Sequence, residues 1–351
     1  MASAIVVHAG ERARLHLAES GLAPAHIACI PAAAGGPKGL ALLPFDRLLA
    51  REWLPRMPAV ELIGASIGAW RMAALAHRDA AAALDRLQHA YVREQNYGHK
   101  PSPAQVATVC RGVARAVTDG AELAPRLRDG AALSVITARA RGPLQSNTRR
   151  AFGRTALDNL LARARLARHL QRVVFHAGAT SRLAPEADGF DTQRVELTHA
   201  NQEDALLASG SIPLICDPVH DIADAPPGDY WDGGLIDYHL QLPYAQLPGV
   251  VLYPHFVPWV TPGWLDKSLP WRARPGAHAW LANVIVIAPS AAMLARLPNG
   301  KLPDRNDFYR YGLDHAARIR DWERAIAEMQ RYADEAFAWM AAPDPSVVQP
   351  L

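Results

Sequence analysis

Short runs of β-branched and apolar residues alternate with longer helical patterns along most of the 351-residue chain. Repeated strand–helix–strand units place their strands in parallel, so the alternation predicts an α/β fold with a largely parallel sheet covered by helices. We expect strands at residues 27–32, 60–65, 133–138, 173–177, 194–198, 250–253 and 284–287. We expect helices at residues 40–53, 67–76, 80–93, 103–117, 155–170 and 308–340.

Two stretches interrupt this alternation. Residues 80–128 read as a polar, all-helical insertion, and residues 254–279 as a loop rich in Pro and Trp. The length of the chain fits either two domains or one large α/β domain. We interpret both stretches as additions to a single domain at residues 1–351, which ends in a long helix within residues 303–341.

The near balance of basic and acidic side chains excludes a strong electrostatic field around the whole molecule. The chain has 37 basic and 34 acidic side chains, a formal net charge of +3. Such a balance does not indicate a nucleic-acid partner, so we expect none.

Cysteine usage and hydropathy indicate the compartment. Cys29, Cys110 and Cys216 are widely spaced and odd in number, which fits neither a disulfide framework nor a Cys-x-x-Cys site. The N-terminal apolar run lacks a basic region before it, and the longest apolar stretch, at residues 281–294, falls short of the roughly 20 residues of a membrane span. We expect a cytoplasmic protein, with peripheral contact at the inner face of the membrane left open.

The first chemical signal is a G-x-S-x-G pattern, Gly64-Ala65-Ser66-Ile67-Gly68, between an expected strand and an expected helix. At such a turn the serine adopts a strained backbone conformation, and the glycines let strand and helix approach closely. The serine hydroxyl then points away from the turn, where a substrate can reach it, as a nucleophile requires. The alternative is a tight turn whose serine only caps the helix.

The second signal is Gly35-Gly36-Pro37-Lys38-Gly39, which also follows an expected strand and opens a helix. Adjacent glycines let backbone N–H groups point toward one anion, and a helix N-terminus adds positive potential there. The anion is either a phosphate or the oxyanion of a tetrahedral intermediate. The spacing matches neither of the common nucleotide-binding glycine motifs, and a plain turn is the alternative.

The third signal is Asp232-Gly233-Gly234, preceded by Tyr230 and Trp231. The glycines permit a tight bend, and the aromatic residues supply apolar surroundings in which a carboxylate becomes a stronger base. A β-turn closed by the Asp side chain is the alternative.

In this order, the three motifs resemble those of the patatin-like phospholipase family. Its members show a G-G-x-[RK]-G loop, a G-x-S-x-G elbow about thirty residues later and a distant Asp-Gly-[Gly/Ala]. Residues 205–213 also resemble the family's helix and small-residue turn, so the resemblance covers roughly residues 27–240. Ala34 stands where the family usually has a third glycine, and Pro37 lacks an N–H group.

The resemblance implies a three-layer α/β/α fold and a lipid acyl hydrolase with a Ser–Asp dyad. Ser66 would be the nucleophile of a serine hydrolase that forms an acyl-enzyme, and Asp232 would be its base. Backbone N–H groups of the Gly35–Gly39 loop, joined by that of Ile67, would form the oxyanion hole. The substrate would be an acyl lipid or another ester. The dyad needs no cofactor, and the sequence shows no metal-binding motif.

Other functions remain open. A Ser–His–Asp triad would recruit His239, His255, His278 or His315. The function would then be that of a small-ester carboxylesterase or acyltransferase. A lipid-binding protein that retains the motifs without turnover is the non-enzymatic alternative.

Two further features bear on the substrate. The loop at residues 254–279 carries Phe256, Trp259, Trp264 and Trp271, which either form an acyl pocket or interfacial lip or pack the loop onto the core. Residues 139–172 form a basic stretch whose only acidic residue is Asp158; it either docks on an anionic membrane or is a solvated helix face. Its arginines are Arg139, Arg141, Arg149, Arg150, Arg154, Arg163, Arg165, Arg168 and Arg172.

Overall fold

The computed structural model describes residues 2–120, 123, 130–179, 181, 183, 185–273 and 278–351. Parts of the expected insertion at residues 80–128 and of the expected loop at residues 254–279 therefore lie outside the described residues.

The described strands form one sheet. They are β1 Ile5–Ala9, β2 Ile27–Ala32, β3 Val60–Ala65, β4 Ala131–Ala140, β5 Leu170–Ala177, β6 Thr192–Glu196, β7 Val219–His220, β8 Asp229–Asp232, β9 Val250–Pro254, β10 Val284–Pro289 and β11 Val348–Pro350. Their order is β11-β1-β10-β9-β2-β3-β4-β5-β6, while β8 pairs with both β4 and β7.

The centre of the sheet is parallel. Strands β10, β9, β2, β3 and β4 all run in the same direction. Antiparallel pairs occur outside this centre, where β1 joins β10 and where β5 and β8 join β4. Every residue of β3 and β10 is buried, as expected for parallel strands covered on both faces. The expected α/β fold with a mostly parallel sheet is confirmed.

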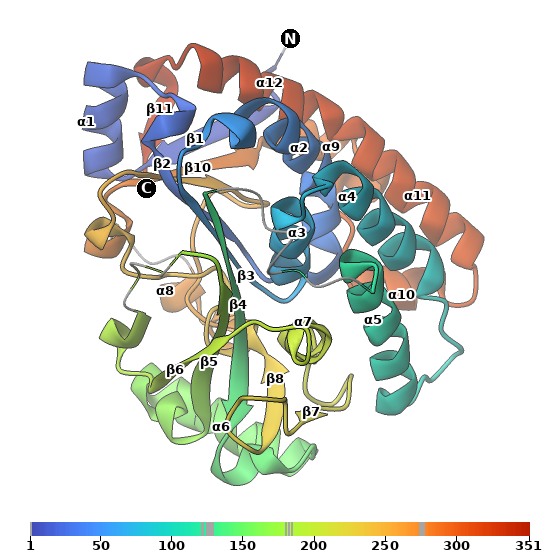
Figure 1. Ribbon diagram of the computed structural model, residues 1–351. Helices are drawn as coiled ribbons and strands as arrows, with labels where there is room; N and C mark the ends of the chain where they lie inside the picture. The colour runs from blue at the N-terminus through green and yellow to red at the C-terminus, as the bar shows by residue number, and fades with distance from the viewer. Residues whose placement is uncertain are drawn as a thin grey trace.

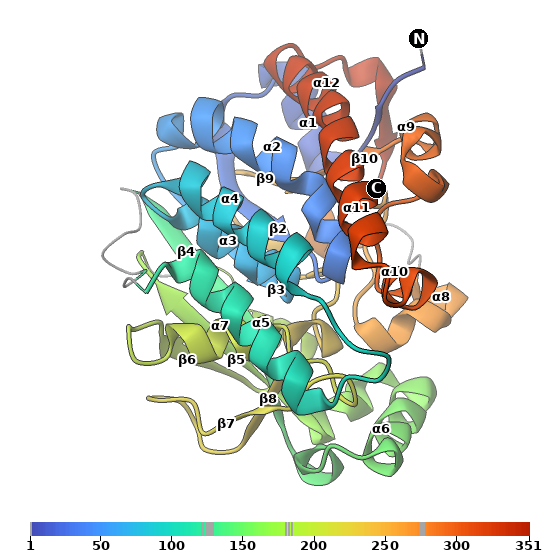
Figure 2. The same ribbon diagram turned by 90° about the vertical axis from the view of Figure 1, so that its right-hand side faces the viewer.

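Helices cover both faces of the sheet. Figures 1 and 2 show α3, α4 and α5 side by side on one face, with α11 and α12 packed against α2, while α1 lies on the opposite face. The helices are α1 Glu11–Ser20, α2 Leu43–Leu48, α3 Ile67–Ala76, α4 Ala80–His89, α5 Pro103–Thr118, α6 Arg149–Leu161, α7 Gln202–Ser209, α8 Pro270–Ala273, α9 Ala291–Arg296, α10 Asn306–Tyr311, α11 His315–Glu328 and α12 Gln330–Ala341. None of the described helices is long and apolar enough to cross a membrane.

Two helices differ from the sequence-based expectation. A helix was expected at residues 155–170, and only its bounds are wrong: α6 begins earlier, where the Thr148 hydroxyl accepts the Ala151 N–H at 3.2 Å, and ends at Leu161, while β5 has begun by residue 170. Residues 303–341 contain α10, α11 and α12 in place of one continuous helix. Gly312, with φ 53°, ends α10, and the Asp314 carboxylate caps α11.

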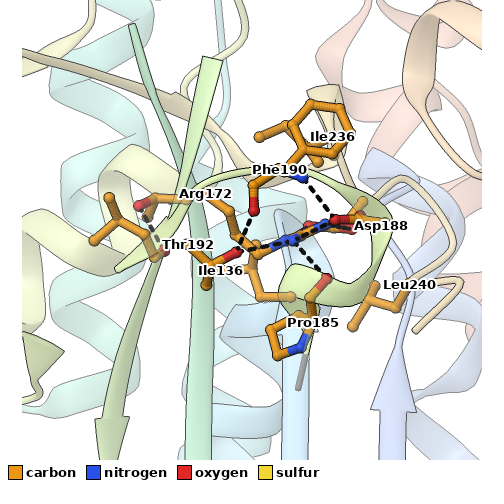
Figure 3. Close-up of polar contacts among 12 residues, drawn as sticks. Ile136, Arg172, Pro185, Asp188, Phe190, Thr192, Ile236 and Leu240 are labelled. Atoms are coloured by element: carbon orange, nitrogen blue, oxygen red, sulfur yellow. Dashed lines mark hydrogen bonds and ion pairs between the residues drawn. The ribbon is translucent and has the colours of Figure 1, made fainter. Parts of the chain in front are cut away.

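A buried ion cluster ties β5 to the segment that follows β8. Arg172 donates two hydrogen bonds to the Asp237 carboxylate, at 2.7 and 2.9 Å, and also pairs with Asp188. Figure 3 shows the guanidinium between Asp188 and the Pro185 carbonyl. Because Asp237 lies five residues after Asp232, the cluster fixes the chain next to that candidate base.

The nine arginines of residues 139–172 do not share one surface. Arg172 is fully buried, and Arg163 pairs at 2.9 Å with the buried Asp266 carboxylate. Exposed guanidinium groups lie on α6, at Arg149, Arg150 and Arg154. The stretch is therefore neither one basic face nor one solvated helix.

Candidate functional site

Ser66 lies in a strained turn between β3 and α3. It caps α3 with φ 58° and ψ −133°, a conformation that L-residues rarely adopt. A Cβ on Gly64 would lie 2.4 Å from the Gly68 backbone, and a Cβ on Gly68 would lie 2.0 Å from the Ala32 carbonyl oxygen. Both glycines are therefore needed for this turn, and the hydroxyl sits at the carboxyl edge of the parallel strands.

Strand β4 brings Asp232 to Ser66. Ala65, which precedes Ser66, pairs with Ile136, and the next residue of β4, Thr137, pairs with Asp232 at the end of β8. Because β5 pairs with the other edge of β4, the two motifs, far apart in the sequence, become neighbours along one edge of this strand.

Asp232 is buried next to the Ser66 hydroxyl. The two residues are 6% and 5% exposed. Burial raises the pKa of Asp232 to about 6, while hydrogen bonds from the Ser66 hydroxyl and the Gly234 N–H and the charge of Arg305 work in the opposite direction. The carboxylate is therefore a stronger base than a solvated one.

The turn after Asp232 packs between β4 and the glycine loop. A Cβ on Gly233 would lie 2.2 Å from the Ile136 carbonyl oxygen, and a Cβ on Gly234 would lie 2.7 Å from the Ala34 side chain. Only glycine fits at these two positions, which explains the Asp-Gly-Gly pattern.

The glycine loop lies beside Ser66 and supplies backbone donors. The segment Gly36–Leu42 is a 3-10 helix whose first N–H groups lack acceptors within the helix. Gly36 has φ 56°, Gly35 is extended, and Pro37 has no N–H group. The N–H groups of Gly35, Gly36 and Lys38 are therefore the candidate oxyanion donors of this loop.

Neighbouring donors are engaged elsewhere. The Ala34 N–H donates to the Tyr238 carbonyl at 2.9 Å, and the Ser66 N–H donates to the Ser209 hydroxyl at 2.9 Å. The Ile67 N–H, at the first position of α3, has no acceptor within that helix. A Cβ on Gly39 would lie 2.8 Å from the Ile67 side chain, so the loop and the elbow are in close contact.

Two cavities meet at Ser66. The smaller, of about 170 Å³, is also lined by Asp232 and by polar and charged groups. The larger, of about 530 Å³, lies against α3 and α5 and is mostly apolar, with Trp70, Tyr91, Val106 and Phe308 in its walls. Both are lined by Gly36, Ser66, Ile212, Arg305 and Asn306.

None of the four histidines considered for a triad hydrogen-bonds to Ser66 or Asp232 within the described structure. His239 and His255 are buried against each other, with ring centroids 4.4 Å apart, and burial lowers the pKa of His255 to about 3. His278 accepts the Trp280 N–H. His315 lines the larger cavity but not the smaller one that holds Asp232.

Only some of the aromatic residues expected in the loop at residues 254–279 lie at the site. Trp264 lines the smaller cavity, and the Phe256 ring packs where a Gly35 Cβ would stand, at 2.7 Å. Trp271 is 67% exposed.

Sequence reasoning missed Ser209, Lys267 and Arg305. The Ser209 hydroxyl accepts the Ser66 N–H and donates to the Ile136 carbonyl at 2.7 Å, while Lys267 and Arg305 line the smaller cavity. Ser209 falls within the stretch at residues 205–213 that carried the family resemblance, but no local pattern distinguishes the two cations.

The remaining cavities contain none of the three motifs. One of about 640 Å³ lies at the opposite edge of the sheet, near Glu61 at the start of β3. No group of three or more metal-ligating side chains occurs among the described residues.

Comparison with known proteins identifies the family. The model of the patatin-like phospholipase family matches residues 33–239, more than half of the chain. The crystal structure of VipD from Legionella pneumophila is a structural neighbour at 14% identity and a TM-score of 0.29; the match covers 72% of this chain and 53% of that one, so the chain spans about half of VipD. Curated proteins gave no match. On the family match, the chain belongs to the patatin-like phospholipase family.

Proposed function

We propose that this protein hydrolyses the carboxylic ester of an acyl lipid, with Ser66 as nucleophile and Asp232 as general base. Membership of the family supports a lipid acyl hydrolase at the family level. The observation that carries the finer proposal is the buried Asp232 carboxylate, which lines the smaller cavity together with Ser66, the residue at which the two cavities meet.

In the first half of the reaction, the Ser66 oxygen attacks the ester carbonyl and its proton passes to Asp232. The tetrahedral intermediate collapses, the bond to the alcohol breaks, and the departing alcohol takes the proton from Asp232. In the second half, a water molecule gives a proton to Asp232 and attacks the acyl-enzyme. Ser66 then recovers that proton and the fatty acid leaves.

The oxyanion of each tetrahedral intermediate would be held by backbone N–H groups. The candidates are those of Gly35, Gly36, Lys38 and Ile67, all close to Ser66. One such donor contributes about 3 kcal/mol to the stabilisation of a transition state. The N-terminus of α3 adds positive potential at the Ser66 oxygen.

The larger cavity is suited to the acyl chain. Its walls are mainly apolar and begin at Ser66. Ile215 and Tyr309 also line it and are 40% and 84% exposed, so the cavity opens to the surface along apolar side chains. An acyl chain would bury apolar surface there on binding.

A fluorophosphonate probe and p-nitrophenyl esters test this proposal. We expect the probe to label wild type at Ser66, and neither labelling nor hydrolysis in Ser66→Ala. Failure of wild type to label and to hydrolyse any ester would favour a lipid-binding protein without turnover. A thousandfold loss of kcat in a correctly folded His315→Ala or His255→Gln variant would replace the dyad with a triad.

A further inference from the structure

The cavity of about 640 Å³ lies at the edge of the sheet opposite Ser66, where the parallel strands β2, β3 and β9 begin. Residues 27–28, 58–61 and 247–250 line it from these strands and the turns before them, and Arg12, Ala13 and His16 line it from α1. Its volume is typical of sites for small molecules. None of the three motifs contributes to its walls, so its occupant is separate from the proposed reaction.

Glu61 places a buried carboxylate in the wall of this cavity. It is 7% exposed, and it accepts a hydrogen bond at 2.8 Å from the hydroxyl of Ser134 and another at 2.8 Å from that of Ser181. Among the described residues, no Lys, Arg or His nitrogen lies within 4 Å of this carboxylate. The His176 ring contacts the far side of Ser134 at 2.9 Å, so any charge on it is one hydroxyl removed from Glu61.

The two serine hydroxyls orient the Glu61 carboxylate without neutralising it. A buried carboxylate is costly unless a positive charge compensates it. Because Glu61 lines the cavity, a cationic ligand bound there could supply that charge.

Asn283 supplies a second acceptor to the same cavity and is 3% exposed. Its Nδ2 donates to the carbonyls of Tyr244 and Gly249 at 2.9 and 2.7 Å, which fixes the orientation of the amide. Its Oδ1 is buried without a hydrogen-bond partner. A buried acceptor of this kind is costly unless a donor reaches it, so a ligand N–H group fits this position.

The two acceptors lie at opposite ends of the cavity. Glu61 belongs to β3, and Asn283 directly precedes β10. Strands β10, β9, β2 and β3 are neighbours in this order, so three strand spacings, about 14 Å, separate the backbones of the two residues. A ligand that contacts both must be elongated.

The basic groups of the cavity leave these acceptors free. Arg12 is exposed and donates to the Ala245 carbonyl at 2.8 Å. His16 and His26 share a hydrogen bond of 3.0 Å between ring nitrogens. Burial lowers the pKa of His16, and the charge of His26 lowers it further, although Glu19 opposes both. At pH 7 the His16 ring is therefore uncharged and does not repel a cation.

We infer that this cavity binds an elongated organic amine, with one ammonium group on Glu61 and a second N–H donor at Asn283. An ammonium group compensates the carboxylate charge and donates to its remaining lone pairs. The methylene chain between the two donors would lie against the apolar side chains of Ile27, Ala28 and Val250.

Calorimetry with spermidine and with putrescine, a shorter diamine, tests the site. We expect wild type to bind one spermidine per chain, and to bind putrescine at least tenfold more weakly because the shorter chain reaches only one acceptor. Glu61→Gln keeps the size of the side chain but removes its charge. This variant should bind spermidine about tenfold more weakly or worse, as expected for the loss of one charge-assisted hydrogen bond.

Glu19→Gln is the matched control. Glu19 is an exposed residue of α1 that does not line the cavity. Its substitution removes the same charge from the nearby surface and should leave the affinity for spermidine unchanged. A loss as large as that of Glu61→Gln would mean that spermidine is held by the general surface charge, and would overturn the inference.

Ala59→Trp blocks the cavity without altering a buried polar group. Ala59 is exposed, lines the cavity and lies two residues before Glu61. The indole ring should weaken spermidine binding at least tenfold, which keeps the test decisive if circular dichroism shows that Glu61→Gln does not fold. The inference is overturned if wild type binds no spermidine, if spermidine and putrescine bind equally, or if the folded variants at residues 59 and 61 bind as wild type does. Because calorimetry measures binding alone, none of these outcomes depends on whether the protein hydrolyses esters.

Discussion

The Ser209 hydroxyl accepts the backbone N–H of Ser66 at 2.9 Å and donates to the Ile136 carbonyl at 2.7 Å. This fully buried hydroxyl therefore connects the strained turn that carries the candidate nucleophile to β4, the strand with which Asp232 pairs one residue further along. The bond also engages the Ser66 N–H, which leaves the oxyanion to other donors.

Ser209→Ala should loosen this turn without removing a reacting group. The Ser66 N–H would lose its acceptor, at a cost of about 1–3 kcal/mol in the free energy of unfolding. We expect a lower melting temperature and a lower kcat, with KM for a soluble ester little changed. A variant with the stability and kcat of wild type would show that Ser209 does not position Ser66.

Ser66→Ala and Asp232→Asn should each abolish ester hydrolysis while the fold is retained. Residues that act as one unit give non-additive losses, so the double variant should be no slower than either single one. Steady-state kinetics should compare kcat of wild type, the two single variants and the double variant, and circular dichroism should check that each variant is folded. Substantial turnover in Asp232→Asn would refute the dyad.

The pH dependence of kcat/KM should follow the ionisation of Asp232. A general base works only when deprotonated, and the pKa of this carboxyl is raised to about 6. Activity should therefore rise with pH through about 6 and then level off. Because the charge of Arg305 lowers this pKa, Arg305→Gln should move the rise to higher pH. A profile that is flat from pH 4 to 8 would contradict the assignment.

Stability should change in the opposite direction over the same range. A carboxyl whose folded pKa lies above its unfolded value destabilises the fold once it ionises, so its favourable contribution is present below about pH 4 and lost as the pH rises through about 6. Asp232→Asn removes this ionisation. Relative to wild type, the variant should therefore gain stability between pH 4 and 8, by on the order of 2 kcal/mol.

Gly36→Ala should reduce kcat far more than it affects KM. The nearest atom to a new Cβ is Arg305 Cγ at 3.4 Å, so space is adequate, but φ 56° disfavours any residue with a Cβ. The loop would rotate and misplace donors that act only on the oxyanion, with a loss of roughly 10²-fold. A raised KM with unchanged kcat would mean that the loop binds the ground-state ester instead.

Val106→Phe should shorten the preferred acyl chain. Val106 lies on α5 and lines the larger cavity, where the added ring would occupy part of the space beyond Ser66. In a p-nitrophenyl ester series, kcat/KM for dodecanoate should fall about tenfold or more relative to butyrate. Thr108→Phe, at an exposed position of the same helix, is the control. A parallel loss on both esters would place the acyl chain elsewhere.

The central strands and the elbow helix could be predicted because local pattern determines them. Strands β2 and β3 and helix α3 match the expected bounds, since each is an apolar run that ends at a turn signal. The short strands β1 and β8 were not expected, because each is stabilised by pairing with residues far away in the sequence, β1 with β10 and β8 with β4.

The cations of the candidate site could not be predicted for the same reason. Nothing near Lys267 or Arg305 in the sequence indicates that folding brings them to one cavity with Lys38. Arg172 was grouped with surface arginines because its partners, Asp188 and Asp237, lie 16 and 65 residues away. The three motifs, in contrast, could be recognised in the sequence, because the tight turns that they form require glycine at positions next to Ser66 and Asp232.

The junction of the two cavities at Ser66 also sets an order of product release under the proposed mechanism. The alcohol would leave through the smaller cavity while the acyl group stays covalently attached and extends into the larger one. The vacated polar space is then the route by which the next nucleophile reaches the acyl carbon. A water molecule that enters by this route completes hydrolysis. A second alcohol that fits the same space would instead take the acyl group from Ser66. The balance between hydrolysis and acyl transfer therefore depends on which molecule occupies the smaller cavity between the two half-reactions.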